Sequence, residues 1–306
     1  PSGVARLYVN LCNYDSTTDK VEKVTTTQSG GYKGYTDEKV ADLGHPLKGK
    51  TIVCFGDSIT ENTYNGKSYT NWIAEVTGAT VINVGVGGSQ IRQRTTPVDT
   101  PTTSMQAYAA LDICNMVRAA CENDFTQAQA GAEWTRDNAS DDNTPIVARL
   151  SAIDWSQVYM VTIFGGTNDW GNASDHLGTS GSTNKGDTLG AINYINNLLS
   201  TTFPTIIVNW VSPIVRWMNY ASGSGTFENW SDNLEKSGYT LKVYAKILGD
   251  EVVLNHLPFI DLYNTLGWNM ANFSSFFGTN DGTHPTKGLE VIGKKLARII
   301  ASINPY

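Results

Sequence analysis

The 306-residue sequence contains no apolar run near the ~18 residues that a bilayer-spanning helix requires. It also has no excess of basic residues, because 22 Lys and Arg stand against 29 Asp and Glu, which gives a net charge of -7. That balance argues against a surface that binds nucleic acid. The chain opens on Pro1 rather than on a basic and then apolar leader, so we expect a mature or excised piece of a longer protein.

Cysteine is scarce, and the four residues are Cys12, Cys54, Cys114 and Cys121. Cys54 lies in an apolar run, where cysteine usually behaves as a small hydrophobic residue. Cys114 and Cys121 are seven residues apart in a helical pattern, which separates them by about 10 Å, too far for a disulfide. No cysteine or histidine spacing is typical of zinc, so we expect no metal and no other cofactor.

A letter-for-letter match to the phosphate-binding P-loop occurs at residues 44–51, but its context is wrong. A P-loop follows a strand and opens a helix, whose N-terminal amides hold the phosphates. Here the pattern precedes an apolar β-like run at residues 52–55. We therefore do not expect nucleotide binding.

Apolar runs and helical patterns alternate from residue 51 onward. We expect five strands, at residues 51–55, 80–84, 158–164, 205–211 and 259–262. Helical patterns lie near residues 67–77, 105–121, 187–200, 232–248 and 286–301. Leu189, Ile192 and Ile195 recur at three-residue steps, as on a helix packed against a sheet. The alternation predicts an α/β fold with a parallel sheet covered on both faces.

The first part of the chain differs in composition from the rest. Residues 4–11 alternate between apolar and other side chains, the period of a half-buried strand, and a polar stretch rich in Thr and Gly follows. We interpret residues 1–48 as a β appendage, or the remnant of a preceding domain, and residues 49–306 as the main domain. Residues 122–145, polar and rich in Ala, Asp and Asn, are expected to form a surface insertion.

A Gly-Asp-Ser-Ile sequence at residues 56–59 ends the first expected strand. A serine at the carboxyl end of a parallel strand is well placed to act as a nucleophile. The same triplet is also ordinary turn chemistry, so other residues have to supply the rest of the argument.

Histidine supplies the next part, because it is the side chain whose charge changes near neutral pH. The four histidines are His45, His176, His256 and His284. His284 has a carboxylate three residues earlier, Asp281, on a glycine-containing turn. That carboxylate could orient the ring, although the same residues could also be a polar helix entry.

Four blocks occur in order: the Gly-Asp-Ser-Ile block, Asn-Val-Gly-Val-Gly-Gly at 83–88, Gly-Thr-Asn-Asp at 166–169 and Asp-Gly-Thr-His at 281–284. Together they resemble the SGNH (GDSL-type) hydrolase family over about residues 50–300. Ile59 stands where the commonest family form has leucine. The resemblance implies a flavodoxin-like, three-layer α/β/α sandwich around a five-stranded parallel sheet.

The resemblance also implies roles for the residues of the blocks. Ser58 would be the nucleophile, His284 the general base and Asp281 the group that orients it. The backbone N–H groups of Ser58 and Gly88 and the side-chain amide of Asn168 would form the oxyanion hole. For Gly88 and Asn168 the alternatives are a flexible turn and a turn-capping amide. The Gly-x-Ser-x-Gly elbow of α/β-hydrolases does not occur in the sequence.

Aromatic residues are frequent after the fourth and fifth expected strands. Trp217, Trp230 and Trp268 lie among Gly, Ser and Asn, so exposed rings could stack on sugars, with burial in the core as the alternative. Arg216 could pair with a carboxylate on an acidic sugar or be a solvated surface residue. We expect a serine esterase that deacetylates a carbohydrate or acts on another small ester. The alternatives are a lipid esterase or thioesterase, and a non-catalytic carbohydrate-binding module of a surface or phage tail protein.

Overall fold

The computed structural model describes residues 12–15, 20–23, 47–172, 176–236 and 238–303. The chain divides into two compact units, Pro1–Pro46 and Leu47–Tyr306. In the first unit, β1 (Cys12–Asp15) and β2 (Lys20–Lys23) form an antiparallel hairpin. The strand expected at residues 4–11 lies outside the described residues.

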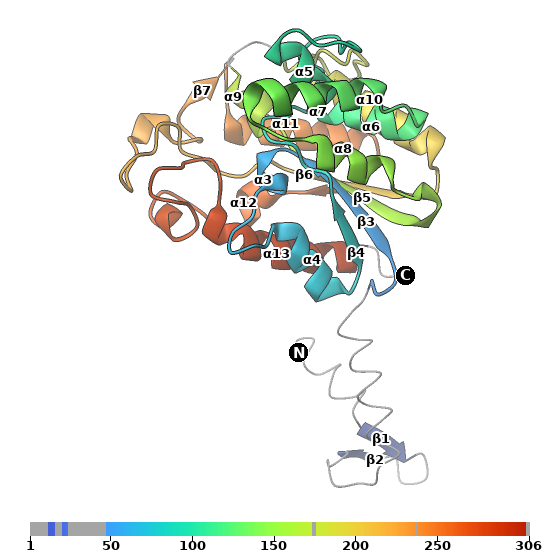
Figure 1. Ribbon diagram of the computed structural model, residues 1–306. Helices are drawn as coiled ribbons and strands as arrows, with labels where there is room; N and C mark the ends of the chain where they lie inside the picture. Colours follow the sequence, from blue (N-terminus) through green and yellow to red (C-terminus); the bar gives the residue numbers. More distant parts are fainter. Residues whose placement is uncertain (1–11, 16–19, 24–46, 173–175, 237, 304–306) are drawn as a thin grey trace. The chain divides into compact units, whose positions relative to one another are not determined.

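A five-stranded parallel sheet, in the order β4-β3-β5-β6-β9, forms the centre of the second unit (Figure 1). Its strands are β3 (Thr51–Gly56), β4 (Thr80–Asn83), β5 (Val158–Phe164), β6 (Ile207–Val211) and β9 (Phe259–Ile260). The chain adds β4 on one side of β3 and then β5 on the other, so the strand order reverses at β3. Ligands bind at such a reversal in open α/β sheets.

Helices cover both faces of this sheet, with α4 and α13 on one face and the helices from α5 to α8 on the other (Figure 1). The longer helices are α4 (Tyr69–Thr77), α5 (Ser104–Ala110), α6 (Ile113–Glu122), α7 (Thr126–Ala139), α8 (Thr144–Ser151), α10 (Thr188–Thr202), α11 (Leu241–Leu254) and α13 (Leu289–Ile303). The predicted α/β/α sandwich with a five-stranded parallel sheet is confirmed.

Shorter elements complete the second unit. They are α3 (Ser58–Glu61), α9 (Thr167–Gly171), α12 (Leu262–Thr265), the hairpin strands β7 (Glu235–Lys236) and β8 (Tyr239–Thr240), and the 3₁₀ turns η1 (Trp155–Gln157), η2 (Phe227–Asn229), η3 (Phe273–Ser275) and η4 (Thr286–Gly288). Several of them directly follow strands of the main sheet, and two of these, α3 and α9, carry blocks of the site described below.

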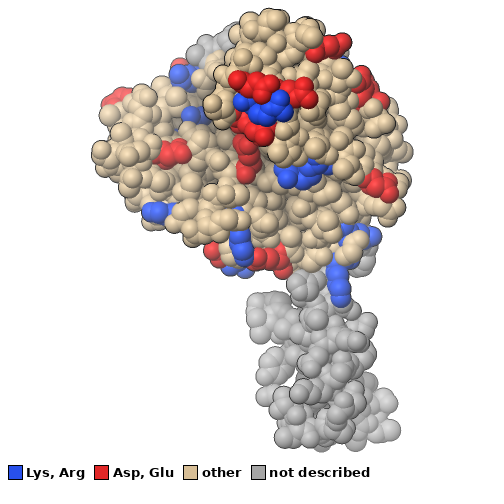
Figure 2. All heavy atoms as spheres, viewed as in Figure 1, with Lys and Arg blue, Asp and Glu red and all other residues tan. Residues whose placement is uncertain are grey.

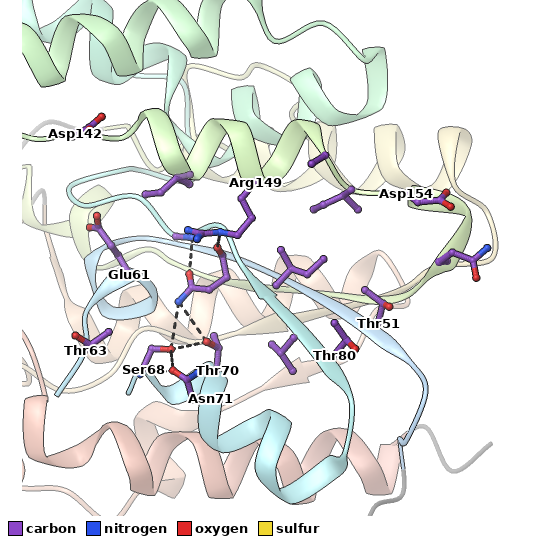
Figure 3. Close-up of a pocket in the computed structure, with 18 residues that line it drawn as sticks. Thr51, Glu61, Thr63, Ser68, Thr70, Asn71, Thr80, Asp142, Arg149 and Asp154 are labelled. Atoms are coloured by element: carbon purple, nitrogen blue, oxygen red, sulfur yellow. Dashed lines mark hydrogen bonds between the residues drawn. The ribbon is translucent and has the colours of Figure 1, made fainter. Parts of the chain in front are cut away.

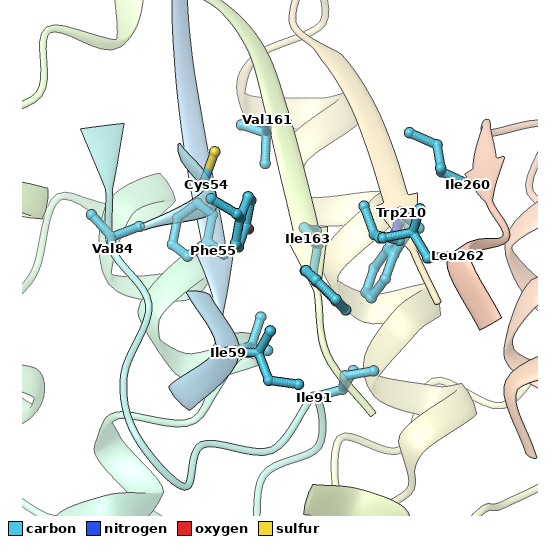
Figure 4. Close-up of a cluster of buried hydrophobic side chains, with 14 of the residues drawn as sticks. Cys54, Phe55, Ile59, Val84, Ile91, Val161, Ile163, Trp210, Ile260 and Leu262 are labelled. Carbon is cyan, nitrogen blue, oxygen red and sulfur yellow. The ribbon is translucent and has the colours of Figure 1, made fainter. Parts of the chain in front are cut away.

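The core lies between the sheet and its helices, and Figure 4 shows the part around β3, β5 and β6. Cys54, Val161 and Ile163 are completely buried there. Strands with helices on both faces are buried on both sides, which explains why β3 and β5 are continuous apolar runs in the sequence. Cys54 packs as a free, buried thiol.

Helices α4 and α13 pack in close contact because α13 carries Gly293 at the interface. A Cβ atom at this position would lie 2.4 Å from the carbonyl oxygen of Tyr69 on α4. A side chain there would therefore push the two helices apart.

The prediction of a single helix over residues 105–121 is wrong, because this segment forms two helices, α5 and α6. Asp112, at the break, is completely buried. Its carboxylate accepts hydrogen bonds from the backbone N–H groups of Gln90 and Arg94, both at 2.9 Å. Desolvation raises the pKa of Asp112 to about 6, although Arg94 acts to lower it. Helical periodicity does not reveal a buried carboxylate that accepts hydrogen bonds from the backbone of a loop about 20 residues earlier in the chain.

The prediction of a surface insertion at residues 122–145 is also wrong, since most of these residues form α7 and the start of α8. One face of α7 is made of small residues, with Ala128, Gly131 and Ala132 buried. A Cβ atom at Gly131 would lie 2.6 Å from the carbonyl oxygen of Ala107 on α5. Small side chains here permit close helix packing.

The helix expected over residues 232–248 begins later, at Leu241. Thr240 caps its N-terminus by accepting a hydrogen bond from the backbone N–H of Val243 at 3.3 Å. The residues before it include the hairpin of β7 and β8. The P-loop-like residues that are described, 47–51, form a turn that leads into β3.

Acidic and basic side chains are interspersed on the face shown in Figure 2, without a large area of either sign. Over the described ranges, no helix is both long and apolar enough to cross a membrane. The same ranges contain no group of three or more His, Cys, Asp or Glu side chains that could hold a metal ion.

Candidate active site

The first block places Ser58 in the turn between β3 and α3. Asp57 is the N-cap of α3, and its carboxylate accepts a hydrogen bond from the backbone N–H of Ile59 at 2.9 Å. A Cβ atom at Gly56 would lie 2.0 Å from Oγ1 of Thr60 and 2.6 Å from the carbonyl oxygen of Phe164, so the turn needs glycine. This local geometry leaves the side chain of Ser58 half-buried at the end of the strand.

Asp57 is almost completely buried behind Ser58. Desolvation raises the pKa of Asp57 to about 7, although the N–H of Ile59 and the nearby His284 act to lower it. The carboxyl group therefore changes charge near neutral pH. It makes no direct hydrogen bond to the ring of His284 in the described structure.

The second block is a glycine-rich loop that packs against α3. A Cβ atom at Gly85 would lie 2.6 Å from the side chain of Thr60, and one at Gly87 would lie 2.8 Å from the carboxylate of Glu61. Gly88 has a φ of +71° in the left-handed region, which favours glycine, while the space around it is open.

The third block, on α9, forms hydrogen bonds with this loop. The side-chain amide of Asn168 donates a hydrogen bond to the carbonyl oxygen of Ser89 at 2.9 Å. The buried carboxylate of Asp169 accepts hydrogen bonds from the backbone N–H groups of Ile91 at 2.9 Å and Arg92 at 3.2 Å. Burial raises the pKa of Asp169, and these two N–H groups oppose the rise. Two adjacent residues of α9 thus hold the loop that carries Gly88.

The fourth block brings His284 into contact with Ser58. Nε2 of His284 lies 2.8 Å from Oγ of Ser58, and Nδ1 lies 2.7 Å from Oδ2 of Asp281. The other carboxylate oxygen of Asp281 accepts hydrogen bonds from the backbone N–H groups of Thr283 at 2.8 Å and His284 at 3.0 Å. Four blocks that are distant in the sequence therefore meet at the end of the sheet where the strands have their carboxyl ends.

The environment of Asp281 determines which nitrogen of His284 carries the proton. Partial burial raises the pKa of Asp281, but the hydrogen bonds from the ring and backbone of His284 and from Thr283 outweigh it and lower the pKa to about 2. Asp281 is therefore ionised at neutral pH and holds a proton on Nδ1. Nε2 is then free to accept a hydrogen bond from the hydroxyl of Ser58.

Arg216 is half-buried and contacts both the third and the fourth block. This corrects the interpretation of Arg216 as a solvated surface residue. Its guanidinium donates to Oγ1 of Thr283 at 2.7 Å and to Oγ1 of Thr167 at 3.2 Å. Arg216 thus links the fourth block to the third. Burial lowers the pKa of Arg216, while the charges of Asp57 and Asp281 act to raise it.

The predicted exposure of the three tryptophans is wrong. Trp217 is only 9% exposed, Trp230 3% and Trp268 5%. The ring centroids of Trp217 and Trp230 are 5.3 Å apart in an edge-to-face contact, and Phe273 packs against both. These rings form a core and present no open face for a sugar. Aromatic residues in a loop have no periodicity that would distinguish buried from exposed positions.

The donors expected to form an oxyanion hole are close to one another. Asn168 is connected to Gly88 through the hydrogen bond that it donates to Ser89. No hydrogen bond from the backbone N–H of Ser58 or Gly88 is present among the described residues. Both groups are thus available to a ligand, which for Ser58 is expected because it lies in the first turn of α3.

Sequence reasoning missed Arg94, which fixes the peptide group of Gly88. Its guanidinium donates to the carbonyl oxygen of Gly88 at 2.6 Å and pairs with Asp112 at 2.7 Å. Asp169 was part of a recognised block, but its role as an anchor for the loop was not foreseen. The only available signal was the position of Arg94 a few residues after the glycine block.

Comparisons with known proteins identify the family of the chain. The family model "GDSL-like Lipase/Acylhydrolase" matches residues 52–296, while no curated protein matches the chain. A solved structure from Lactobacillus plantarum is similar over 84% of this chain and 98% of its own, with 20% identity and a TM-score of 0.56. At that identity the likeness supports the fold alone.

Two further solved structures are more distant. A carbohydrate acetylesterase from Sinorhizobium meliloti shares 15% identity over 83% of this chain and 100% of its own, with a TM-score of 0.46. An aryl esterase from M. smegmatis shares 17% identity over 83% of this chain and 100% of its own, with a TM-score of 0.44. Neither bears on the substrate of this protein. The family match, in contrast, runs through all four blocks, and the chain belongs to the GDSL-like lipase/acylhydrolase family, the SGNH hydrolases.

Proposed function

We propose that the protein is a serine esterase and that Ser58 is its nucleophile. The observation that supports this most directly is the continuous hydrogen-bond chain from Ser58 through His284 to Asp281, with distances of 2.8 and 2.7 Å. A serine hydroxyl is a weak nucleophile unless a base in contact removes its proton. We further propose that residues 49–306 form the catalytic domain and residues 1–48 an appendage.

In the proposed reaction, Oγ of Ser58 forms a bond to the ester carbonyl carbon while its proton passes to Nε2 of His284. The N–H groups of Ser58 and Gly88 and the amide of Asn168 stabilise the oxyanion of the tetrahedral intermediate. The bond to the alcohol then breaks, and His284 returns the proton to the leaving oxygen. A water molecule, activated by His284, releases the acid from Ser58 in the second half.

Replacing Ser58 by alanine tests the assignment directly. We expect Ser58→Ala to fold normally and to lose nearly all hydrolysis of p-nitrophenyl acetate, because no acyl-enzyme can form. A fluorophosphonate probe should label the wild-type protein at Ser58, as peptide mapping by mass spectrometry would show. Labelling of a different serine in an active protein would disprove the role of Ser58.

The substrate that we propose is an O-acetylated carbohydrate. A hollow of about 740 Å³ begins at Glu61, at the end of α3, and runs along the edge strand β4 (Figure 3). Much of its lining is hydroxyl, amide and charged groups, including Thr63, Asn71 and Arg149. Ser58 and His284 do not line it. These hydroxyl, amide and charged side chains next to the site suit a glycan better than an alkyl chain.

Acyl chain length distinguishes this substrate from a lipid. A pocket for long chains would bury aliphatic surface, worth ~0.8 kcal/mol per CH₂ group. We expect kcat/KM for p-nitrophenyl esters to be highest for acetate and to fall with chain length, and acetate to be released from acetylated glycans. A preference for octanoate over acetate would favour a lipid esterase instead. Absence of any hydrolysis or labelling would favour a non-catalytic binding module.

A further inference from the structure

A second hollow lies beside the proposed oxyanion donors and has no role in the mechanism above. We name it the Arg92 hollow. Its lining includes Gln90, Arg92, Arg94, Ser104, Met105 and Gly171. Arg94 donates to the carbonyl oxygen of Gly88, and Gly171 ends α9, the helix that carries Asn168. The hollow is therefore connected to two of the three oxyanion donors.

Arg92 is the unusual member of this lining, because it is buried and its guanidinium forms no ion pair within the described residues. It is 6% exposed, and its Nε is buried without a hydrogen-bond partner. Among the described residues, its guanidinium makes one long hydrogen bond, to the carbonyl oxygen of Gly186 at 3.4 Å. No ion pair to Arg92 is present in the described part of the chain. A buried cation that lacks a partner is costly for the folded state.

Two other charged groups near Arg92, Arg94 and Asp169, already have partners, and the ionisable side chain of His176 also lines the hollow. Arg94 is neutralised by Asp112, with 2.7 Å between the charged atoms. Asp169 interacts with the charge of Arg92, but its oxygens accept hydrogen bonds from the backbone of Ile91 and Arg92 and from Thr188. The guanidinium of Arg92 therefore makes no direct ion pair with either group, although the charge of Asp169 lies nearby.

Gln90 adds a second unsatisfied polar group to the same lining. It is 3% exposed, and its Oε1 is buried without a partner. Its backbone N–H is used by Asp112, so the side chain is not needed to hold the loop. A side-chain amide can donate or accept, which suits a hydroxyl group next to an anion.

We propose that the Arg92 hollow binds a carboxylate of the substrate, with Arg92 as the paired cation and Gln90 as the partner of an adjacent hydroxyl. A guanidinium binds a carboxylate through two parallel hydrogen bonds. Because the nearby charge of Asp169 offsets part of the charge of Arg92, the hollow matches a carboxylate better than a phosphate, which carries about -1.5 to -2 at neutral pH. The inference rests on the proposed esterase function and specifies its substrate class as carboxylate-bearing esters.

The carboxylate has two possible sources, which the kinetic test separates. In one arm, the p-nitrophenyl half-ester of succinate is compared with p-nitrophenyl butyrate, so the acyl group carries the charge. In the other arm, acetate release from an acetylated oligouronate is compared with release from an acetylated neutral oligosaccharide. We expect wild-type kcat/KM to favour the anionic member of one pair by about tenfold or more, the effect of a charge-assisted hydrogen bond.

Two sets of variants then test the residues. Arg92→Gln should remove most of the preference for the anionic substrate, and Arg92→Lys should retain part of it. Arg118→Gln is the matched control, because Arg118 also has a buried Nε without a partner but does not line the hollow. Retention of the full preference by Arg92→Gln would overturn the proposal.

Met105 provides a test that does not disturb a buried group, since it is 61% exposed at the rim. Met105→Glu should lower kcat/KM for the anionic substrate several-fold by repulsion, and Met105→Lys should raise it. Val253→Glu is the control, at a position 59% exposed on α11 outside the hollow. Equal effects of the glutamate at both positions would contradict the proposal.

A binding measurement separates this inference from the esterase assignment. Calorimetry with a free oligouronate and with succinate should show binding of at least one to Ser58→Ala, and about tenfold weaker binding to Ser58→Ala/Arg92→Gln. Binding without hydrolysis by the wild-type protein would refute the esterase function and support the anion site. Hydrolysis without a preference in either pair, or no binding of either anion, would refute the anion site.

Discussion

The side chain of Asp281 determines what His284 can do. Its carboxylate is ionised because hydrogen bonds from His284 and Thr283 lower its pKa to about 2. The resulting charge holds a proton on Nδ1 and, in the proposed mechanism, stabilises the imidazolium that forms when Ser58 is deprotonated. The aspartate thus acts through the histidine and does not touch the substrate.

This division of roles predicts a ranking of variants. His284→Ala should lower kcat by roughly 10⁵- to 10⁶-fold, whereas Asp281→Asn should lower it by about 10⁴-fold, by analogy with serine proteases. An amide can turn its NH₂ group toward Nδ1 and force the proton onto Nε2, which then cannot accept from Ser58. Steady-state rates on p-nitrophenyl acetate at neutral pH check the ranking. Unchanged kcat in both variants would require a different base.

Residues whose identity follows from local turn chemistry could be predicted from the sequence. Gly56, Ser58 and His284 belong to short sequence blocks whose residue types are typical of the turns that they form. Arg216 and Trp230 could not be placed, because their burial depends on contacts with segments far away in the chain. Composition alone leaves a loop arginine or tryptophan equally compatible with surface and core.

At the scale of elements, the pair α4 and α13 connects the serine to the histidine. Helix α4 follows the serine turn, and its Tyr69 hydroxyl lies 3.1 Å from Oγ1 of Thr60. Helix α13 begins a few residues after His284. The close packing at Gly293 therefore helps to set the position of one catalytic segment relative to the other.

Gly293→Ala should consequently reduce both stability and activity. A Cβ atom 2.4 Å from the carbonyl oxygen of Tyr69 forces the helices apart, at a cost of about 1–3 kcal/mol in the free energy of unfolding. We also expect kcat to fall several-fold, because the segment of His284 shifts with α13. Urea unfolding and esterase rates would measure the two effects.

Gly131→Ala provides the comparison, because the same kind of contact, 2.6 Å from the carbonyl oxygen of Ala107, joins α7 to α5. It should lose similar stability and keep its kcat, since neither helix carries a catalytic segment. A kcat for Gly293→Ala as high as that of Gly131→Ala would show that the packing of α13 does not position His284.

Strands were easier to predict than helices. Buried parallel strands are short apolar runs, so all five expected strands are present, although the last is limited to Phe259–Ile260. The predictions at residues 105–121 and 122–145 are wrong because tertiary contacts, rather than composition, determine where these helices form. Asp112 ends a pattern to serve a distant loop, and the small residues of α7 pack against α5 despite a polar composition.

For the whole molecule, three carboxyl groups make stability depend on pH in opposite directions. The raised pKa values of Asp57, about 7, and Asp112, about 6, stabilise the fold below pH ~4, and this contribution is lost as pH rises through 6 and 7. The lowered pKa of Asp281, about 2, stabilises the fold above pH ~4, and this contribution is lost as pH falls toward 2.

We therefore expect the contribution of Asp57 to decrease the free energy of unfolding as the pH rises from ~4 to ~7. Asp57→Asn should flatten this part of the profile, because asparagine can still cap α3 but does not titrate. Urea unfolding of both proteins at unit steps of pH would test this. An unchanged slope in Asp57→Asn would show that Asp57 titrates alike in the folded and unfolded chain.

The way the histidine segment is held has a consequence for biosynthesis. Gly282 is fastened to Trp217, with the N–H of Trp217 donating to its carbonyl oxygen at 2.8 Å, and α13 follows and docks on α4. A growing chain folds from its N-terminal side, so the sheet through β6 and the turn of Ser58 can exist before His284 has been translated. The nascent protein would already carry its nucleophile but lack its base. In the proposed mechanism, hydrolytic activity would then arise only after α13 has been translated and has packed on α4.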